Sequence, residues 1–246
     1  MRIALFADVH ANLQALEACL AHARAQGAER FVFLGDFVGY GADAAPVVAS
    51  IMRECERGAI AVKGNHDEAI EGSGFYFNEA ASASLEWART TLAPEAKRFL
   101  AALPLTAREG ACCFVHSSAA APNRWSYVDS PGAAAHCMDA TDAAYTFCGH
   151  VHDQTLYFRG RPGRAQVFAP TPGTTIPVRS NRRWLAIAGS VGQPRDRNPA
   201  AAYAMFDTER EAVTFFRVPY DARAAAARIR AAGLPESLAL RLELGI

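Results

Sequence analysis

The stretch R-I-A-L-F-A-D-V-H, residues 2–10, sets the pattern on which the fold depends. Its apolar part, Arg2–Ala7, is typical of a buried strand, and Asn12–Gln26 follows with apolar residues at helical spacing. Phe31–Leu34 predicts a second strand, which again ends in a polar residue, Asp36. This alternation of strand, loop and helix favours parallel βαβ units.

Further strands and helices follow along the chain. We predict helices over 43–55, 78–92, 94–103 and 130–139, and strands over 59–62, 111–115 and 144–148. From Gln154 onward the pattern predicts short antiparallel strands: Thr155–Phe158, Ala165–Phe168, Trp184–Ala188, Ala202–Phe206 and Ala212–Val218. Residues 170–177 read as a Pro/Gly-rich loop, and helices follow from about residue 221. The sequence predicts one domain over 1–246, with two packed sheets and helices outside.

Composition limits the classes of function. Half of the 246 residues are apolar and the formal charge is zero, which indicates an ordered globular protein and argues against a nucleic-acid polymer as partner. Met1–Ala7 does not resemble a secretory leader, and no apolar run is long enough to span a membrane. The six cysteines form no C-x-x-C pair, which favours buried thiols in a reducing compartment. We therefore expect a cytoplasmic protein.

Polar residues that can bind metal follow predicted strands five times. They are Asp8 and His10, Asp36, Asn65, His116, and His150 with His152. The carboxyl ends of strands in an open α/β sheet are where ligands bind, so these residues are expected to converge. Asp8 and His10, as alternate residues of an extended segment, would point to the same side.

Oxygen and imidazole ligands without thiolate suit Mn, Fe or Zn. Two divalent ions about 3.5–4 Å apart form the clamp that is used in phosphate hydrolysis. A carboxylate must bridge two like-charged ions at that distance, and Asp36 is the candidate. Taken alone, each signal has a plainer explanation, a satisfied polar pair or a packed histidine, so the prediction depends on their combination.

Five short motifs occur in order: D-V-H (8–10), G-D-F-V-G-Y-G (35–41), G-N-H-D (64–67), V-H (115–116) and G-H-V-H (149–152). They resemble the five motifs of the calcineurin-like metallophosphoesterase superfamily, and G-S-V-G-Q-P-R (189–195) is similar to a segment of its small bacterial members. G-Y-G (39–41), with Phe77, Asn78 and Trp87, resembles the bacterial branch labelled diadenosine tetraphosphatase-like. The resemblance implies a four-layer α/β/β/α sandwich of two mixed β-sheets flanked by helices.

The resemblance also implies roles for the residues. One metal would take Asp8, His10, Asp36 and His152, and the other would take Asp36, Asn65, His116 and His150. His66 would be the general acid, so that Asp36, Asn65 and His66 form the catalytic group. Attack by a hydroxide that bridges the two divalent ions would then hydrolyse the phosphoester.

One motif departs from the protein Ser/Thr phosphatase branch. That branch reads G-D-x-V-D-R-G, whereas Gly39 and Tyr40 stand where its Asp and Arg would be. The Asp orients the catalytic histidine and the Arg binds substrate phosphate, so the substitution argues against a protein phosphatase. Asp67 either orients His66 instead or has a surface or capping role.

Arg124, Tyr40 and Arg195 are the candidates for substrate binding. Trp125 and Tyr127 either stack on a base or anchor their loop to the core, and Arg195 either meets a phosphate or pairs with a carboxylate such as Asp196. We expect a phosphorylated small molecule as substrate, a nucleotide-like phosphodiester or dinucleotide polyphosphate. The alternatives are a phosphomonoesterase, a Ser/Thr protein phosphatase, a nuclease and a catalytically silent scaffold. Nothing in the sequence predicts an oligomeric state.

Overall fold

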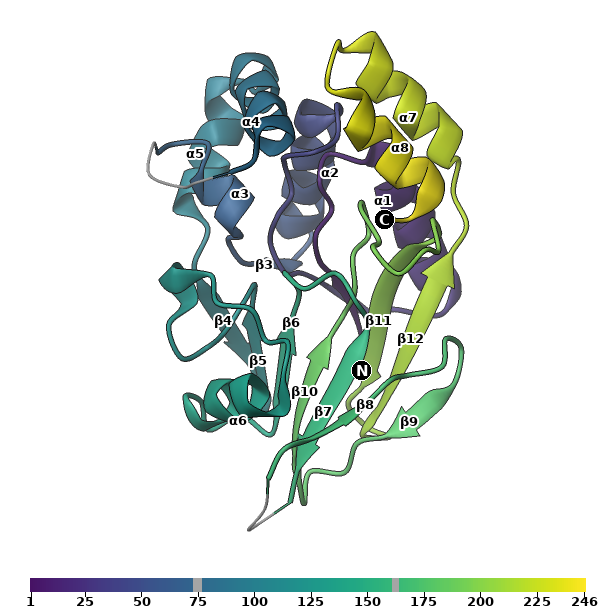
Figure 1. Ribbon diagram of the computed structural model, residues 1–246. Coiled ribbons are helices and arrows are strands. Elements are labelled where there is room, and N and C mark those ends of the chain that lie inside the picture. The colour runs from purple at the N-terminus through teal and green to yellow at the C-terminus, as the bar shows by residue number, and fades with distance from the viewer. Residues whose placement is uncertain (73–76, 161–163) are drawn as a thin grey trace.

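Two mixed sheets lie in the middle of the protein (Figure 1). The computed structural model describes residues 1–72, 77–160 and 164–246, and within these ranges each sheet has six strands. The first sheet has the order β3 (Ile60–Ala61), β2 (Arg30–Phe33), β1 (Arg2–Phe6), β11 (Ala201–Asp207), β12 (Ala212–Val218) and β9 (Thr175–Pro177). The second has the order β4 (Thr106–Glu109), β5 (Cys112–Val115), β6 (Tyr145–Cys148), β10 (Arg183–Ile187), β7 (Thr155–Arg159) and β8 (Gln166–Phe168).

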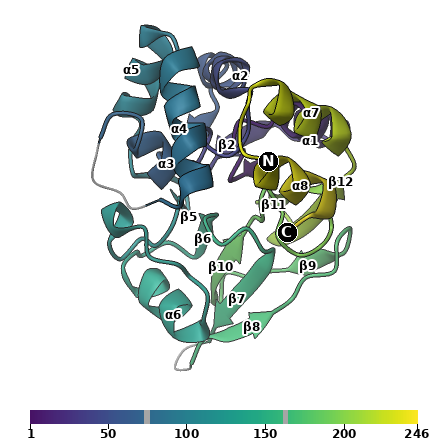
Figure 2. The same ribbon diagram turned by 45° about the horizontal axis from the view of Figure 1, so that its top comes forward.

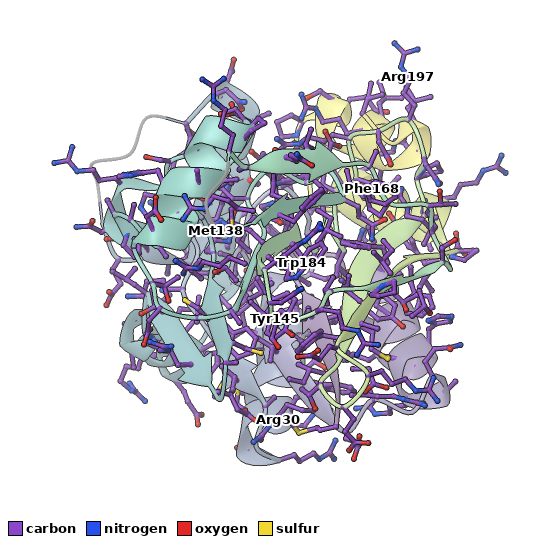
Figure 3. All side chains as sticks on the ribbon, turned by 90° about the horizontal axis from the view of Figure 1, so that it is seen from below. Arg30, Met138, Tyr145, Phe168, Trp184 and Arg197 are labelled. Carbon is purple, nitrogen blue, oxygen red and sulfur yellow. The ribbon has the colours of Figure 1, made fainter. Side chains whose placement is uncertain are left out.

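The side chains of β1 alternate between two cores, because successive residues of a strand face opposite sides of the sheet. Ile3 and Leu5 are buried between the two sheets, whereas Phe6 is buried against the helices. Tyr145 and Trp184 of the second sheet belong to the core between the sheets and are labelled in Figure 3. The strand at the start of the chain is therefore buried on both faces, as its continuous apolar run predicts.

Helices cover the outer faces of both sheets. Those on the first sheet are α1 (Leu13–Ala25), α2 (Ala44–Glu56), α4 (Glu79–Thr91) and α5 (Pro94–Ala102), and α6 (Pro131–Asp139) lies on the second. Short helical turns follow two strands, α3 (Asn65–Glu68) and a 3₁₀ turn over Pro122–Arg124. The predicted α/β/β/α sandwich is confirmed.

The C-terminal segment forms a helical hairpin, α7 (Ala222–Ala231) and α8 (Glu236–Leu244), beside α1 (Figure 2). The Asp221 side chain caps α7 by accepting a hydrogen bond from the Ala224 amide at 2.9 Å. On α7, Arg228 pairs with Asp43 at the start of α2 at 2.7 Å. Tyr40 packs against the apolar cluster of the hairpin. The hairpin therefore contacts a loop that follows β2.

The structure differs from the strand predictions in three places. β10 was expected in an antiparallel region and pairs antiparallel with β7, but on its other side it pairs with β6 in parallel, because the second sheet places β10 between β6 and β7. The predicted loop over 170–177 contains β9, which ends at Pro177 and pairs with β12 at a sheet edge, where a missing N–H is tolerated. β4 was not predicted, since this edge strand is largely exposed and lacks an apolar pattern.

No helix in the described ranges is long and apolar enough to cross a membrane. All six cysteines are free thiols, and all but Cys55 are buried. They pack as small apolar side chains, as their irregular spacing suggests.

Candidate metal centre

The predicted ligand residues lie in loops that directly follow strands of both sheets. The loops and their residues are Asp8 and His10 after β1, Asp36 after β2, Asn65 after β3, His116 after β5, and His150 and His152 after β6. All are buried except Asn65, which is half-buried. The structure therefore brings together the residues that the sequence predicts, from the carboxyl ends of five parallel strands.

The backbone of these loops is left-handed at several positions. Asp8 (φ 53°), His10 (φ 46°), Asp36 (φ 56°), His150 (φ 67°) and His152 (φ 74°) all have positive φ. Our premise that Asp8 and His10 belong to an extended segment is therefore wrong. The side chains converge through tight left-handed turns, a conformation that costs energy for residues other than glycine and tends to occur at functional sites.

Asp8, His10 and His152 form the first group of donor atoms. The Nε2 atoms of His10 and His152 lie 3.2 Å apart, and Asp8 Oδ1 lies 3.6 Å from His152 Nε2. The His150 amide donates hydrogen bonds to both carboxylate oxygens of Asp8, at 3.1 and 3.0 Å. This contact requires a close approach at Gly149, where a Cβ would lie 2.6 Å from Asp8 Oδ2.

Asn65, His116 and His150 form the second group. His116 Nε2 lies 3.2 Å from Asn65 Oδ1 and 3.1 Å from His150 Nδ1. Asp36 lies between the groups, with Oδ2 at 3.3 Å from His116 Nε2 and 3.8 Å from His10 Nε2. Its other oxygen, Oδ1, accepts a hydrogen bond from the His66 amide at 2.9 Å. Asp36 is thus the carboxylate that both groups share.

Backbone carbonyls fix the orientation of the four imidazoles. Nδ1 of His10, His116 and His152 meets the carbonyl oxygens of Val38, Leu34 and Gln193 at 3.1, 2.7 and 2.6 Å. Nε2 of His150 meets the Trp125 carbonyl at 2.8 Å. A carbonyl can only accept, so each of these ring nitrogens carries the proton, and the other nitrogen of each neutral ring turns a lone pair inward.

This arrangement fits divalent cations. In their neutral forms, His10 and His152 face each other with two acceptor nitrogens 3.2 Å apart, and no proton lies between them. A cation satisfies both lone pairs, and nearby carboxylates balance its charge. Nitrogen and carboxylate donors without thiolate suit Mn, Fe or Zn. The residues present therefore fit metal ions on both sides of Asp36.

Electrostatics keep most of the imidazoles neutral. Burial lowers the pKa of His10 and of His152 well below the ordinary value, and burial together with the charge of His116 lowers the pKa of His150 to about 3. For His116, burial also lowers the pKa, but the Asp36 carboxylate, the Asp8 charge and the Leu34 carbonyl together outweigh burial and raise the pKa to about 9. His116 is therefore the imidazole of this group that most favours the protonated form.

His66 lies at the edge of this group with one ring nitrogen unused. It is buried, and its Nδ1 has no hydrogen-bond partner among the residues that the structure describes. The ring packs against His10, Tyr40 and Phe77, with centroids 4.9, 4.7 and 4.8 Å away. Burial lowers the pKa of His66 below its ordinary value. The position is one from which an imidazole can reach a ligand in the adjoining cleft.

Asp67 does not orient His66. Its carboxylate, fully buried, accepts hydrogen bonds from the amides of Asp36 and Phe37, both at 2.8 Å, and from Gly64 at 3.0 Å. Asp67 thus caps α3 and ties the loop after β3 to the loop after β2. Of the predicted roles, the structure matches the capping role, and the surface role is wrong because the side chain is buried.

A cleft of about 440 Å³ opens beside the donor atoms, and Tyr40, Arg124 and Arg195 all line it. Arg195 donates to Gln193 Oε1 at 3.3 and 3.0 Å, and its guanidinium lies 5.7 Å from the centre of the Tyr40 ring. Asp196, the predicted alternative partner of Arg195, pairs instead with Arg217 at 2.6 Å. The Arg195 charge therefore faces the cleft, and no carboxylate within 1–72, 77–160 or 164–246 forms an ion pair with it.

Tyr127 and Trp125 make contacts that the sequence did not predict. The Tyr127 ring stacks on His150 at 4.2 Å and is 54% exposed, so it is not anchored in the core. Trp125 contributes its carbonyl to His150 and an edge contact to His116 at 5.9 Å. The sequence does not reveal which side chain a backbone carbonyl contacts. Within 125–127, only the aromatic side chains indicated that this loop contributes to the site.

Comparisons with known proteins agree with this geometry. A family model described as the calcineurin-like phosphoesterase superfamily domain matches residues 1–211. An uncharacterized protein of Methanocaldococcus jannaschii is 32% identical over 254 residues, covering 99% of this chain and 98% of that protein.

Two solved structures are similar over the full length of this chain. The metallophosphoesterase from Sphaerobacter thermophilus is 36% identical, with a TM-score of 0.87 over 100% of this chain and 99% of the other. A hypothetical protein from Pyrococcus horikoshii OT3 is 20% identical, with a TM-score of 0.80 over 100% and 98% of the two chains, and shares the fold.

Proposed function

Because this chain belongs to the calcineurin-like phosphoesterase superfamily and is thus a hydrolase of phosphoester bonds, we propose that it cleaves nucleotide-like phosphodiesters with two divalent metal ions. The observation that carries the proposal is the position of Asp36. One of its oxygens lies within 3.8 Å of a histidine nitrogen from each donor group. A shared carboxylate is what two neighbouring cations require.

Each ion has a set of residues to hold it. Asp8, His10, Asp36 and His152 would hold one ion, and Asp36, Asn65, His116 and His150 would hold the other. When bound, two such ions supply a hydroxide nucleophile at neutral pH and neutralise charge on the phosphoryl oxygens. The carbonyls that fix the imidazoles hold the donor atoms in place before any ion binds.

His66 would donate the proton to the departing oxygen. Its ring lines the cleft, and a phosphate bound nearby would favour the protonated form. Arg195, which Gln193 holds at the cleft, would bind a phosphoryl oxygen, and Arg124 also lines the cleft. Tyr40 in place of an arginine supports a small diester rather than a phosphoprotein as substrate.

The first test is metal content together with turnover. The purified protein should contain close to two Mn, Fe or Zn ions per chain by elemental analysis, and should hydrolyse bis(p-nitrophenyl) phosphate with added Mn. Asp36→Asn should lower turnover by at least about a hundredfold, because the shared charge is lost. The exposed carboxylate of Asp129, in a neighbouring loop, provides the control, and Asp129→Asn should leave turnover unchanged.

Other outcomes identify the alternatives. A protein that binds no metal and hydrolyses no phosphoester would be a silent scaffold, which contradicts the proposal. Faster hydrolysis of p-nitrophenyl phosphate than of the diester would make the enzyme a phosphomonoesterase. Unchanged turnover in Asp36→Asn would refute the shared carboxylate.

A further inference from the structure

A second cavity adjoins the candidate active-site cleft. Its volume is about 450 Å³, and Tyr40 and Asn78 line both spaces. The remaining wall comes from the start of α4, with Glu79, and from one side of α8, with Ser237 and Arg241. We call this space the α8 pocket.

We propose that the α8 pocket binds the leaving-group arm of a diester substrate, a polar uncharged group of the nucleoside class. The inference rests on the proposed function. Each of the two spaces falls within the roughly 300–1,000 Å³ that small-molecule sites occupy. A monoester needs only the space beside the donor atoms, whereas a diester has a second arm that must go elsewhere.

The position of His66 indicates which arm enters the pocket. The proposed proton donor to the leaving oxygen packs against Tyr40, with ring centroids 4.7 Å apart, and Tyr40 is the wall that the two spaces share. The leaving oxygen would therefore lie on the Tyr40 side of the phosphate. The group attached to that oxygen extends past Tyr40 toward α8.

The chemistry of the wall favours a neutral polar group. Asn78 Oδ1 already accepts from the Ala81 amide at 2.9 Å, which leaves its side-chain NH₂ as a donor. Ser237 can donate or accept, Glu79 accepts and Arg241 donates. One carboxylate and one guanidinium balance each other, so the pocket carries no excess positive charge for a second phosphate. Donors and acceptors on several sides suit the edges of a base or the hydroxyls of a sugar.

Tyr40 is held rigidly enough to act as a fixed wall. It adopts φ 60°, and its amide donates to Ser84 Oγ at 2.7 Å. Its ring packs against the apolar cluster of the α7–α8 hairpin and lies under the Arg195 guanidinium. The hairpin thus positions a residue of the cleft as well as lining the pocket.

The pocket lies partly outside the matched family domain. The family model covers residues 1–211, whereas α8 spans Glu236–Leu244. A binding site that includes α8 would let this chain select substrates by contacts that residues 1–211 alone do not provide. We therefore assign substrate selection to α8 and the chemistry to the strand-end loops.

The test fills the pocket and compares two diesters. Ser237 is exposed and lines the pocket, whereas Leu240 is 42% exposed on the same helix and does not line it. Ser237→Trp should raise KM at least roughly tenfold for thymidylyl-(3′→5′)-thymidine, whose leaving arm is a nucleoside. At saturating substrate, kcat for bis(p-nitrophenyl) phosphate should stay within about twofold of the parent value, because filling the pocket weakens the binding of a departing arm and leaves the strand-end loops unchanged. Leu240→Trp should change neither, and thermal melting of both variants should match that of the parent protein.

Two further outcomes separate the pocket from the proposed function. In the first outcome, the parent protein hydrolyses bis(p-nitrophenyl) phosphate, but thymidylyl-(3′→5′)-thymidine is not a substrate, or its KM is the same in Ser237→Trp and Leu240→Trp. This outcome overturns the assignment of the α8 pocket and leaves the proposed phosphodiesterase activity intact. If the parent protein with Mn hydrolyses neither compound, the proposed function itself fails.

Discussion

Gly39→Ala tests the role of His66 without altering a ligand or His66 itself. Gly39 has φ 83°, and a Cβ at this position would lie 2.2 Å from His66 Nδ1. Ordinary van der Waals contact begins near 3.4 Å, so the imidazole would have to retreat by about 1.2 Å. A displacement of about 1 Å in a catalytic group can cost roughly a hundredfold in rate.

The expected loss depends on the leaving group. With a nucleoside as the departing alcohol, a proton donor is needed, so kcat should fall by roughly a hundredfold in Gly39→Ala. With p-nitrophenolate, a stable anion that departs without a proton, kcat should fall by less than about tenfold. Steady-state kinetics with both diesters at saturating Mn would measure the two ratios, and elemental analysis should show unchanged metal content.

Gly173→Ala is the matched control. Gly173 has φ 79° but no atom within 4 Å of the added Cβ. Both substitutions carry the left-handed backbone cost of about 1–2 kcal/mol, which denaturant unfolding can measure. Only Gly39→Ala should alter catalysis. Equal losses on the two substrates, or full retention of nucleoside release, would refute the assignment of His66 as proton donor.

Three other predictions concern the stability and loading of the site. Asp67→Ala should lower the free energy of unfolding by about 3 kcal/mol or more in urea titrations, because three buried amides lose their acceptor; a loss below about 1 kcal/mol would contradict the loop-tying role. Metal binding should displace the proton of His116, whose pKa is raised to about 9, so calorimetry in two buffers should detect a released proton and an apparent affinity that rises about tenfold per pH unit up to pH 9; a pH-independent affinity would contradict this. Tyr127→Ala should weaken metal binding by roughly three- to tenfold in chelator competition, since the ring stacked on His150 is lost; Tyr127→Phe, which keeps the ring, should bind like the parent protein.

Much of the fold could be predicted because several apolar runs that form strands are each followed by a residue of a type that binds metal. The strand over 2–7 is buried on both faces, so its apolar run is continuous and easily recognised. By contrast, β4 and β9 lie at sheet edges, where exposed or proline-containing segments carry little pattern. The parallel partner of β10 depends on long-range packing between residues far apart in sequence, which local periodicity does not encode.

The residues of the candidate metal centre could be selected from the sequence, but their conformation could not. Residue type and position after a strand suffice to select Asp8 and His152. The left-handed turns that aim them follow from contacts with distant segments: Gly192 donates its amide to Asp8 O, and Ser190 donates its amide to His152 O. Such contacts exist only in the folded chain. The α8 pocket was likewise beyond prediction, since nothing in 235–241 resembles a binding motif.

The position of β1 between β2 and β11 has a consequence for how the protein is made in the cell. One neighbour, β2, emerges from the ribosome soon after β1, but the other begins at Ala201, almost two hundred residues later. The first sheet cannot close, and the loop that carries Asp8 cannot meet the segment around Gly192, until most of the chain has been translated. The proposed metal site would therefore be completed only when a strand that begins about two hundred residues after β1 has closed the first sheet.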